Sequence, residues 1–162
     1  QRKGNHRNAC IKRCHQQMKH ILTLCIGNIC RSPLAEVLLA RELPQHQVWS
    51  AGLAAVVGAG ADPLSQQIAL EQALDLSAHR AQQVTAPMCQ LADVILVMEQ
   101  SHKAWLEQQY PLVRGKVFRL GQFGGFEIAD PHRQPREAFD AAFAAIRQGV
   151  ADWAPRIRQL SA

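Results

Sequence analysis

Residues 20–33 constrain the fold of this chain more than any other stretch. They read HILTLCIGNICRSP, in which a short apolar run ends at Cys25, a tight loop follows, and Arg31-Ser32-Pro33 opens a helix-like segment. This order predicts a strand, a loop and a helix in immediate succession. We expect Ser32 to be the N-cap of the helix and Pro33 its first residue, where the missing N–H costs nothing.

The loop between Cys25 and Arg31 has the length of an anion-binding nest. The five residues that separate the two can aim successive backbone N–H groups at one point, at the N-terminus of the following helix. Gly27 and Asn28 suit positions that need a left-handed backbone or a close approach to a ligand. We therefore predict that a phosphate or similar oxyanion binds in a loop formed by Ile26, Gly27, Asn28, Ile29, Cys30 and Arg31.

Cys25 is the candidate nucleophile of this loop. The positive end of the helix dipole and the Arg31 guanidinium both favour the thiolate form of its side chain. A thiolate there could attack phosphorus while Arg31 holds two phosphoryl oxygens. A cysteine at the end of a strand is more often a buried core thiol. The spacing C-x5-R-S-P at a strand-to-helix junction favours the catalytic interpretation.

Four short apolar runs alternate with helix-like segments along the chain. Such alternation predicts right-handed crossovers and a parallel sheet covered by helices on both faces. The expected fold class is α/β, a small three-layer sandwich with a four-stranded parallel sheet and ligands at the carboxyl ends of its strands. Pro155 is expected to kink or break the last helix. The predicted strands cover residues 20–25, 47–51, 94–98 and 116–120, and the predicted helices cover 33–43, 63–74, 101–109 and 135–160.

The net charge of +5 is concentrated at the N-terminus. Residues 1–19 hold six of the 18 Lys and Arg and no acidic residue, which leaves 12 basic against 13 acidic residues in the rest of the chain. We therefore expect a basic, disordered extension over residues 1–18, one domain over 19–162, and no nucleic-acid partner. Binding of the extension to nucleic acid or to an acidic membrane is the weaker alternative. The extension has no apolar segment typical of a secretory signal, and Met18 could be the natural start.

The cysteine content argues against a disulfide scaffold. The chain has five cysteines, an odd number, and two of them flank the predicted nucleophile loop, so a reducing cytoplasm is expected. Cys10 and Cys14 lie near His6 and His15 in the extension, but their spacing matches no closed zinc site. No apolar run is long enough for membrane insertion.

Cleavage of an aryl phosphate needs a general acid, and two Asp-Pro pairs are candidates. Asp62 directly precedes an amphipathic segment and is explained as a helix N-cap. Asp130 follows the fourth predicted strand and a Gly-rich loop, where a turn aspartate is the alternative interpretation. Asp130 is the better candidate because it has no comparable structural role.

The segment CIGNICRSP resembles the signature loop of the low-molecular-weight protein tyrosine phosphatases. The resemblance implies a flavodoxin-like version of the expected fold, with Cys25 as the nucleophile and Asp130, in a late Asp-Pro loop, as the acid. It also implies a reversible disulfide between Cys30 and Cys25, for which a merely structural Cys30 is the alternative. A polar network that shapes the loop is implied for Asn28, Ser32, Ser50 and His79. His46 and His102 have no such support and are expected at the surface.

Three further stretches, SAGLAAVVG, ADPHR and REAFDAAF, resemble the bacterial branch associated with tyrosine autokinases of capsule and exopolysaccharide export. In that branch a small apolar residue, here Leu53, replaces an aromatic wall of the substrate cleft, and Ile26 and His132 are its other expected walls. The resemblance implies a phosphotyrosine phosphatase that needs no metal or cofactor, with a phosphotyrosine protein, in particular a tyrosine autokinase, as its partner. The oligomeric state stays open.

Three other functions are compatible with parts of the pattern. Thiol-coupled arsenate reductases share the loop but need a downstream cysteine pair, and this chain has only Cys89 there. Phosphoarginine phosphatases resemble the loop but carry threonine at the position of Ile29. A non-catalytic oxyanion-binding module would not need both Cys25 and Asp130.

Overall fold

The computed structural model of the chain describes residues 18–161. The expected basic extension and the cysteines and histidines within it lie outside the described residues, except for Met18. In chain order the elements are β1 (His20–Cys25), α2 (Arg31–Glu42), β2 (Gln47–Gly52), α3 (Pro63–Glu71), α4 (Ala86–Leu91), β3 (Val94–Val97), α5 (Gln100–Gln109), the 3₁₀ helix η1 (Pro111–Val113), β4 (Val117–Arg119) and α6 (Arg136–Ser161).

The four strands form one parallel sheet in the order β2-β1-β3-β4. The strand β1 pairs with β2 on one side and β3 on the other, so the connection from β1 to β2 and the connection from β2 to β3 run in opposite directions along the sheet. In open α/β sheets this reversal creates the crevice in which ligands bind, at the carboxyl ends of the strands. Cys25, the last residue of β1, lies at that crevice. The predicted fold class is confirmed.

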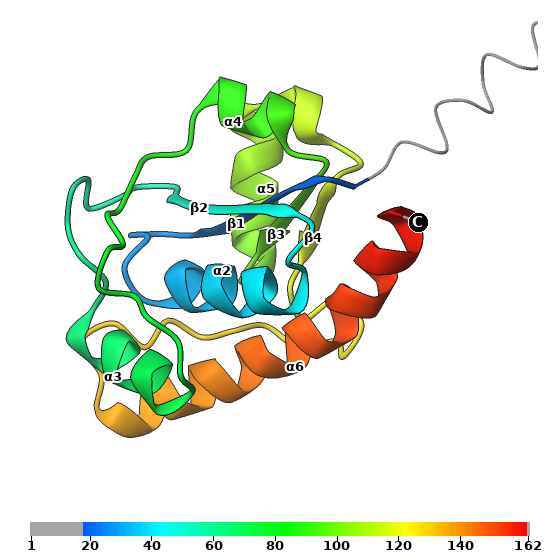
Figure 1. Cartoon of the computed structure of the whole chain (residues 1–162). Helices are drawn as coiled ribbons and strands as arrows, with labels where there is room; N and C mark the ends of the chain where they lie inside the picture. The colour runs from blue at the N-terminus through cyan, green and yellow to red at the C-terminus, as the bar shows by residue number, and fades with distance from the viewer. Residues whose placement is uncertain (1–17, 162) are drawn as a thin grey trace, which may run out of the picture.

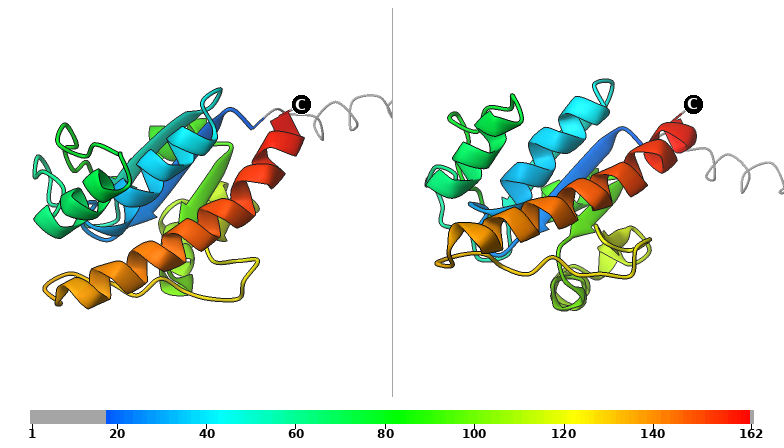
Figure 2. Two further views of the ribbon diagram at one scale, coloured as in Figure 1. Left: turned by 60° about the horizontal axis from the view of Figure 1, so that its bottom comes forward. Right: turned by 90° about the horizontal axis from the view of Figure 1, so that it is seen from below.

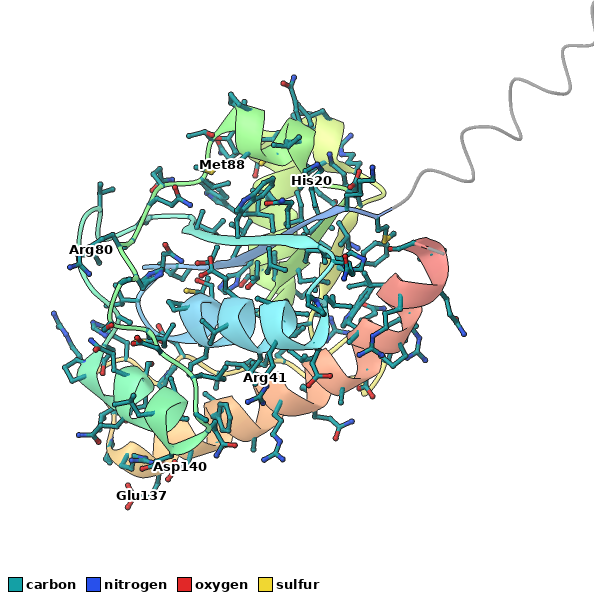
Figure 3. The ribbon with its side chains drawn as sticks, in the orientation of Figure 1. His20, Arg41, Arg80, Met88, Glu137 and Asp140 are labelled. Atoms are coloured by element: carbon teal, nitrogen blue, oxygen red, sulfur yellow. The ribbon has the colours of Figure 1, made fainter. Side chains whose placement is uncertain are left out.

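Helices cover both faces of the sheet (Figure 1). Helices α2, α3 and α6 pack on one face and α4 and α5 on the other, and α6 runs along the first face beside α2 (Figure 2). Alternate strand residues supply the two cores: Ile21 and Leu96 face α2 and α6, whereas Leu22 and Ile95 face α4 and α5. The labelled side chains show the same two sides of the sheet: Met88 lies on the side of α4, and Arg41, Glu137 and Asp140 lie on the side of α2 and α6 (Figure 3).

Three details of the helices differ from the sequence-based expectation. Helix α2 begins at Arg31, and its N-cap position is Cys30 without a side-chain cap, so the prediction of Ser32 as N-cap is wrong. The short helix α4 was not predicted; Thr85 caps it, and its six residues are too few for a clear apolar periodicity. Pro155 does not break α6, because burial of Trp153 and Ile157 on either side of it holds the helix against the sheet.

None of the helices within residues 18–161 combines the length and the hydropathy that crossing a lipid bilayer requires.

We predict that Gly149→Ala destabilises the fold. Gly149 lies on the buried face of α6, where an added Cβ would meet the Leu120 side chain at 2.7 Å and its carbonyl oxygen at 2.8 Å. Overpacking of this kind costs about 1–3 kcal/mol, whereas better helix propensity would return only about 1 kcal/mol. Urea unfolding should show a net loss of stability. Arg147→Ala, at an exposed position of the same helix, is the control. A Gly149→Ala protein as stable as the parent would contradict this packing.

Candidate active site

Cys25 and Arg31 lie at the bottom of a surface cavity. The strand β1 ends at Cys25, whose side chain is only 2% exposed, and helix α2 starts at Arg31. The loop between them, residues 26–30, wraps around the cavity floor. The cavity is lined by Cys25, Ile26, Gly27, Ile29, Cys30, Arg31, Ala54, Val56, Asp130 and His132.

Every backbone carbonyl of residues 25–30 accepts a hydrogen bond from outside the loop. In loop order the donors are the N–H groups of Leu53, Ala54 and Val56, the Nε2 of His79, the N–H of Asp62 and the hydroxyl of Ser65, at 2.9, 3.0, 3.0, 2.7, 2.8 and 3.2 Å. By contrast, the N–H groups of residues 26–30 find no acceptor in the described part of the chain. Carbonyls fixed outward and unused N–H groups are what an anion-binding nest requires.

Asn28 holds the loop in shape from inside. Its φ of 58° places it in the left-handed region, as the sequence predicted. Its Nδ2 donates to the hydroxyls of Ser32 at 2.8 Å and Ser50 at 2.9 Å, and its Oδ1 accepts from the N–H of Gln82 at 2.9 Å. Gly27 has no left-handed φ; it lines the cavity.

Ser32 connects this network to Cys25. Its Oγ lies 3.0 Å from the Cys25 Sγ and already accepts a hydrogen bond from Asn28. The one proton of the hydroxyl is therefore free to point at the sulfur. A hydrogen bond in this direction stabilises a thiolate. Of the predicted network residues, Ser32, Ser50 and His79 thus each form a hydrogen bond with Asn28.

The guanidinium of Arg31 is buried and anchored on one side. Its Nη1 donates to the Glu99 Oε2 at 2.7 Å and to the carbonyl of Ile128 at 2.8 Å. Its Nε has no hydrogen-bond partner among the described residues, and its Nη2 is 3.8 Å from the Asp130 Oδ2. The Nε and Nη2 edge is thus available to bind two oxygens of one tetrahedral anion.

Glu99 is a site residue that the sequence reasoning missed. It lies two residues beyond the end of β3, and its carboxylate pairs with both Arg31 and the Nε2 of His102, the latter at 3.1 Å. Its position could have indicated it, because an acid directly after a buried central strand lies at the carboxyl edge of the sheet.

His102 is buried beneath this ion pair, so its expected surface position is wrong. Burial, followed by the positive charge of Arg31, lowers the pKa of His102. A neutral imidazole can donate its Nε2–H to Glu99 without adding charge to the site. The helix-like segment that carries His102 gave no sign of this, because Arg31 and other charged groups near the imidazole come from distant parts of the chain. His46 is half-buried, with its Nε2 2.8 Å from the Ser161 hydroxyl.

Asp130 and Asp62 occupy different positions. Asp130 is half-exposed at the cavity rim, and its Oδ1 accepts from the N–H of His132 at 3.0 Å. Asp62 caps helix α3, as expected, because its Oδ1 accepts from the N–H of Leu64 at 2.9 Å. Only Asp130 lines the cavity above the thiol.

The expected cleft residues divide between two neighbouring hollows. Ile26 and His132 line the mouth of the cavity above Cys25. Leu53 is buried and does not line that cavity; it lines an adjoining hollow together with Ile26 and Trp105. The sequence reasoning did not identify Ala54 and Val56, which form the wall where Leu53 was expected.

Cys30 is a buried free thiol beside the cavity. Burial, followed by the negative charge of Asp62, raises the pKa of Cys30 to about 12. Its thiol is therefore protonated at neutral pH. The disulfide with Cys25 stays a prediction.

Comparison with known proteins gives consistent matches over the described region. The family described as low molecular weight phosphotyrosine protein phosphatase matches residues 20–161. The chain is similar to the probable low molecular weight protein-tyrosine-phosphatase EpsP of Ralstonia nicotianae, with 46% identity over 88% of this chain and 99% of the relative. Among solved structures, Vibrio vulnificus Wzb in complex with benzylphosphonate has 41% identity and a TM-score of 0.83, covering 86% of this chain and 99% of that one. The arginine phosphatase YwlE of Geobacillus stearothermophilus has 31% identity and a TM-score of 0.81, covering 87% and 94%.

We predict that Glu99→Gln strengthens phosphate binding. The substitution keeps an oxygen that can accept from Arg31 but removes the negative charge that offsets the guanidinium. Loss of one negative charge close to the bound anion should tighten binding of inorganic phosphate by about three- to tenfold. Calorimetric titration measures the affinity. Glu127→Gln is the matched control, because Glu127 is an exposed acid that accepts from the N–H of Gln100 and does not pair with Arg31. Unchanged or weaker binding in Glu99→Gln would contradict this role.

Proposed function

Because the chain belongs to the low molecular weight phosphotyrosine protein phosphatase family, in its bacterial capsule- and exopolysaccharide-associated branch, we propose that it hydrolyses phosphotyrosine through a cysteinyl-phosphate at Cys25. The observation that supports this most is the arrangement of the loop 26–30, whose carbonyls are all bonded outward while its N–H groups are unused beside the thiol. These donors and the free edge of Arg31 fit the three non-bridging oxygens of a phosphoryl group.

In the first step the Cys25 thiolate attacks phosphorus and the bond to the tyrosyl oxygen breaks. The negative charge that spreads over the phosphoryl oxygens meets donors that are already in place, so little reorganisation is needed. Asp130, at the rim of the cavity, gives its proton to the departing phenolate. Tyrosine leaves, and the phosphoryl group stays on the sulfur of Cys25.

In the second step the Asp130 carboxylate takes a proton from water, and the oxygen of that water attacks phosphorus. The phosphorus–sulfur bond breaks, which releases inorganic phosphate and returns Cys25 as a thiolate. The Ser32 hydroxyl, 3.0 Å from the sulfur, stabilises the leaving thiolate. No step requires a metal ion or cofactor.

The depth of the site supports phosphotyrosine as the substrate. Cys25 is 2% exposed, whereas Ile26 at the mouth is 40% exposed, so the phosphoryl group must reach below the surface. An aryl ring is long enough to place it there, and the shorter phosphoserine is not. The resemblance of three sequence stretches to the capsule- and exopolysaccharide-associated branch favours a bacterial tyrosine autokinase as the protein substrate. A free catalytic thiol is best maintained in a reducing cytoplasm.

We predict that Cys25→Ser abolishes phosphate release from a phosphotyrosine peptide, while the parent chain remains active in excess chelator. Serine is not a thiolate, but it leaves the anion-binding loop unchanged, so the variant should still bind inorganic phosphate. Cys89→Ser removes a buried thiol on the other face of the sheet and should retain activity. Phosphoserine and phosphoarginine peptides test the alternative substrates. Faster release from phosphoarginine, or turnover by Cys25→Ser, would reject the proposal.

We predict that Asp130→Asn slows the enzyme most for aryl phosphates with poor leaving groups. An amide cannot donate the proton, and a general acid contributes about 10²- to 10⁴-fold. The measurement is the dependence of kcat/KM on the pKa of the leaving phenol. Asp62→Asn should leave that dependence unchanged, because asparagine can still cap α3. An equal loss for good and poor leaving groups would rule out Asp130 as the acid.

A further inference from the structure

Three side chains with metal-binding atoms meet at one side of the active-site cavity. The Cys30 Sγ, a carboxylate oxygen of Asp62 and a ring nitrogen of His132 all lie within 4.8 Å of one another. The Sγ of Cys30 is 4.0 Å from the Nδ1 of His132. The three residues come from the loop after β1, the start of α3 and the loop before α6. The proposed reaction does not use these three side chains together.

Two of the three residues are held in place by the fold. The carbonyl of Cys30 accepts from the Ser65 hydroxyl of α3 at 3.2 Å, and the N–H of Asp62 donates to the carbonyl of Ile29 at 2.8 Å. The Asp62 Oδ1 accepts from the N–H of Leu64, which fixes the direction of the carboxylate. The fold therefore fixes a buried sulfur and a half-buried carboxylate side by side, and His132 is the exposed, adjustable member.

We propose that Cys30, Asp62 and His132 bind a zinc ion at the rim of the catalytic cavity. Sulfur, imidazole nitrogen and carboxylate oxygen are the donors that zinc prefers, whereas magnesium and calcium favour oxygen alone. Zinc bonds of about 2.0–2.3 Å place tetrahedral ligands about 3.3–3.8 Å apart, so His132 needs to move only by about an ångström. Binding releases the Cys30 proton to solvent, and the fourth position is left for water.

Occupation of this site inhibits the phosphatase reversibly. The N–H of His132 donates to the Asp130 Oδ1, so both residues belong to one turn. A metal that draws His132 toward Cys30 restrains this turn. Asp130 can then no longer move to the position from which it would protonate the leaving group. This consequence, unlike the metal binding itself, rests on the proposed role of Asp130. Zinc is here an inhibitor, and catalysis remains independent of metal.

Cobalt(II) is the spectroscopic probe that tests the site without reference to activity. A cobalt–thiolate bond gives a charge-transfer band, so the readout reports only on cysteines. The full chain carries Cys10→Ser and Cys14→Ser in every sample, which removes the thiols of the N-terminal segment. The titrations use Cys25→Ser, Cys30→Ser, Cys89→Ser, Asp62→Asn and His132→Phe in oxygen-free buffer, and competition with zinc gives its affinity.

The band should persist in Cys25→Ser and Cys89→Ser and disappear in Cys30→Ser. His132→Phe keeps an aromatic ring at the rim but removes its nitrogens, and Asp62→Asn keeps the helix cap. Because even outer-shell changes cost about 10- to 100-fold in metal affinity, each should weaken zinc binding at least tenfold. A band that survives in Cys30→Ser but vanishes in Cys25→Ser, or no band in any sample, would overturn the proposal. So would unchanged affinity in His132→Phe, a substitution at an exposed site that does not threaten folding.

An activity assay separates the metal site from its consequence. Micromolar zinc should inhibit the parent chain, chelator should restore its turnover, and His132→Phe should need at least tenfold more zinc for the same inhibition. Cobalt binding at Cys30 without inhibition by zinc would confirm the metal site and reject the proposed inhibition through the turn that holds Asp130. If no variant hydrolyses phosphotyrosine, the cobalt data still decide whether the metal site exists.

Discussion

The outward anchoring of the loop carbonyls is the constraint on which the site depends. The loop 26–30, with its N–H groups left unused, would be unstable alone, because its carbonyls would need partners on the outer side. Those partners come from the loop after β2, the start of α3, and His79. The segments after β2 therefore act as a frame for the nucleophile loop. The left-handed Asn28 completes this frame from within, through three side-chain hydrogen bonds.

Charge balance is the second requirement of the site. A buried guanidinium is costly unless it is paired and hydrogen-bonded. Glu99 and the Ile128 carbonyl meet this requirement on one side of Arg31 and leave the other side for the substrate. Glu99 is in turn held by a neutral His102. The arrangement fixes the arginine in a position to bind an anion before any anion arrives, which is the preorganisation that catalysis of phosphoryl transfer needs.

The rim of the cavity differs in character from its floor. The floor is rigid and buried, whereas Asp130 and His132 are exposed and share one turn. In the proposed reaction Asp130 must approach different leaving groups and later a water molecule, and an exposed turn allows this. The same adjustability lets His132 approach Cys30 and Asp62. The proposed catalysis and the proposed metal inhibition would therefore both use the exposed turn at the rim above the buried floor of the cavity.

The sequence by itself determined most of the local structure and predicted the reacting groups. The apolar run before Cys25, the spacing to Arg31 and the alternation of strands and helices depend on neighbours in the chain, so they were readable and the parallel sheet followed. Only the tertiary structure decided which distant side chains complete the site. Glu99 reaches Arg31 across 68 residues, and Ser32 lies inside α2, where its hydroxyl contacts the sulfur of Cys25 and the amide of Asn28. Burial of His102 likewise depends on how separate segments pack, a property that no local pattern contains.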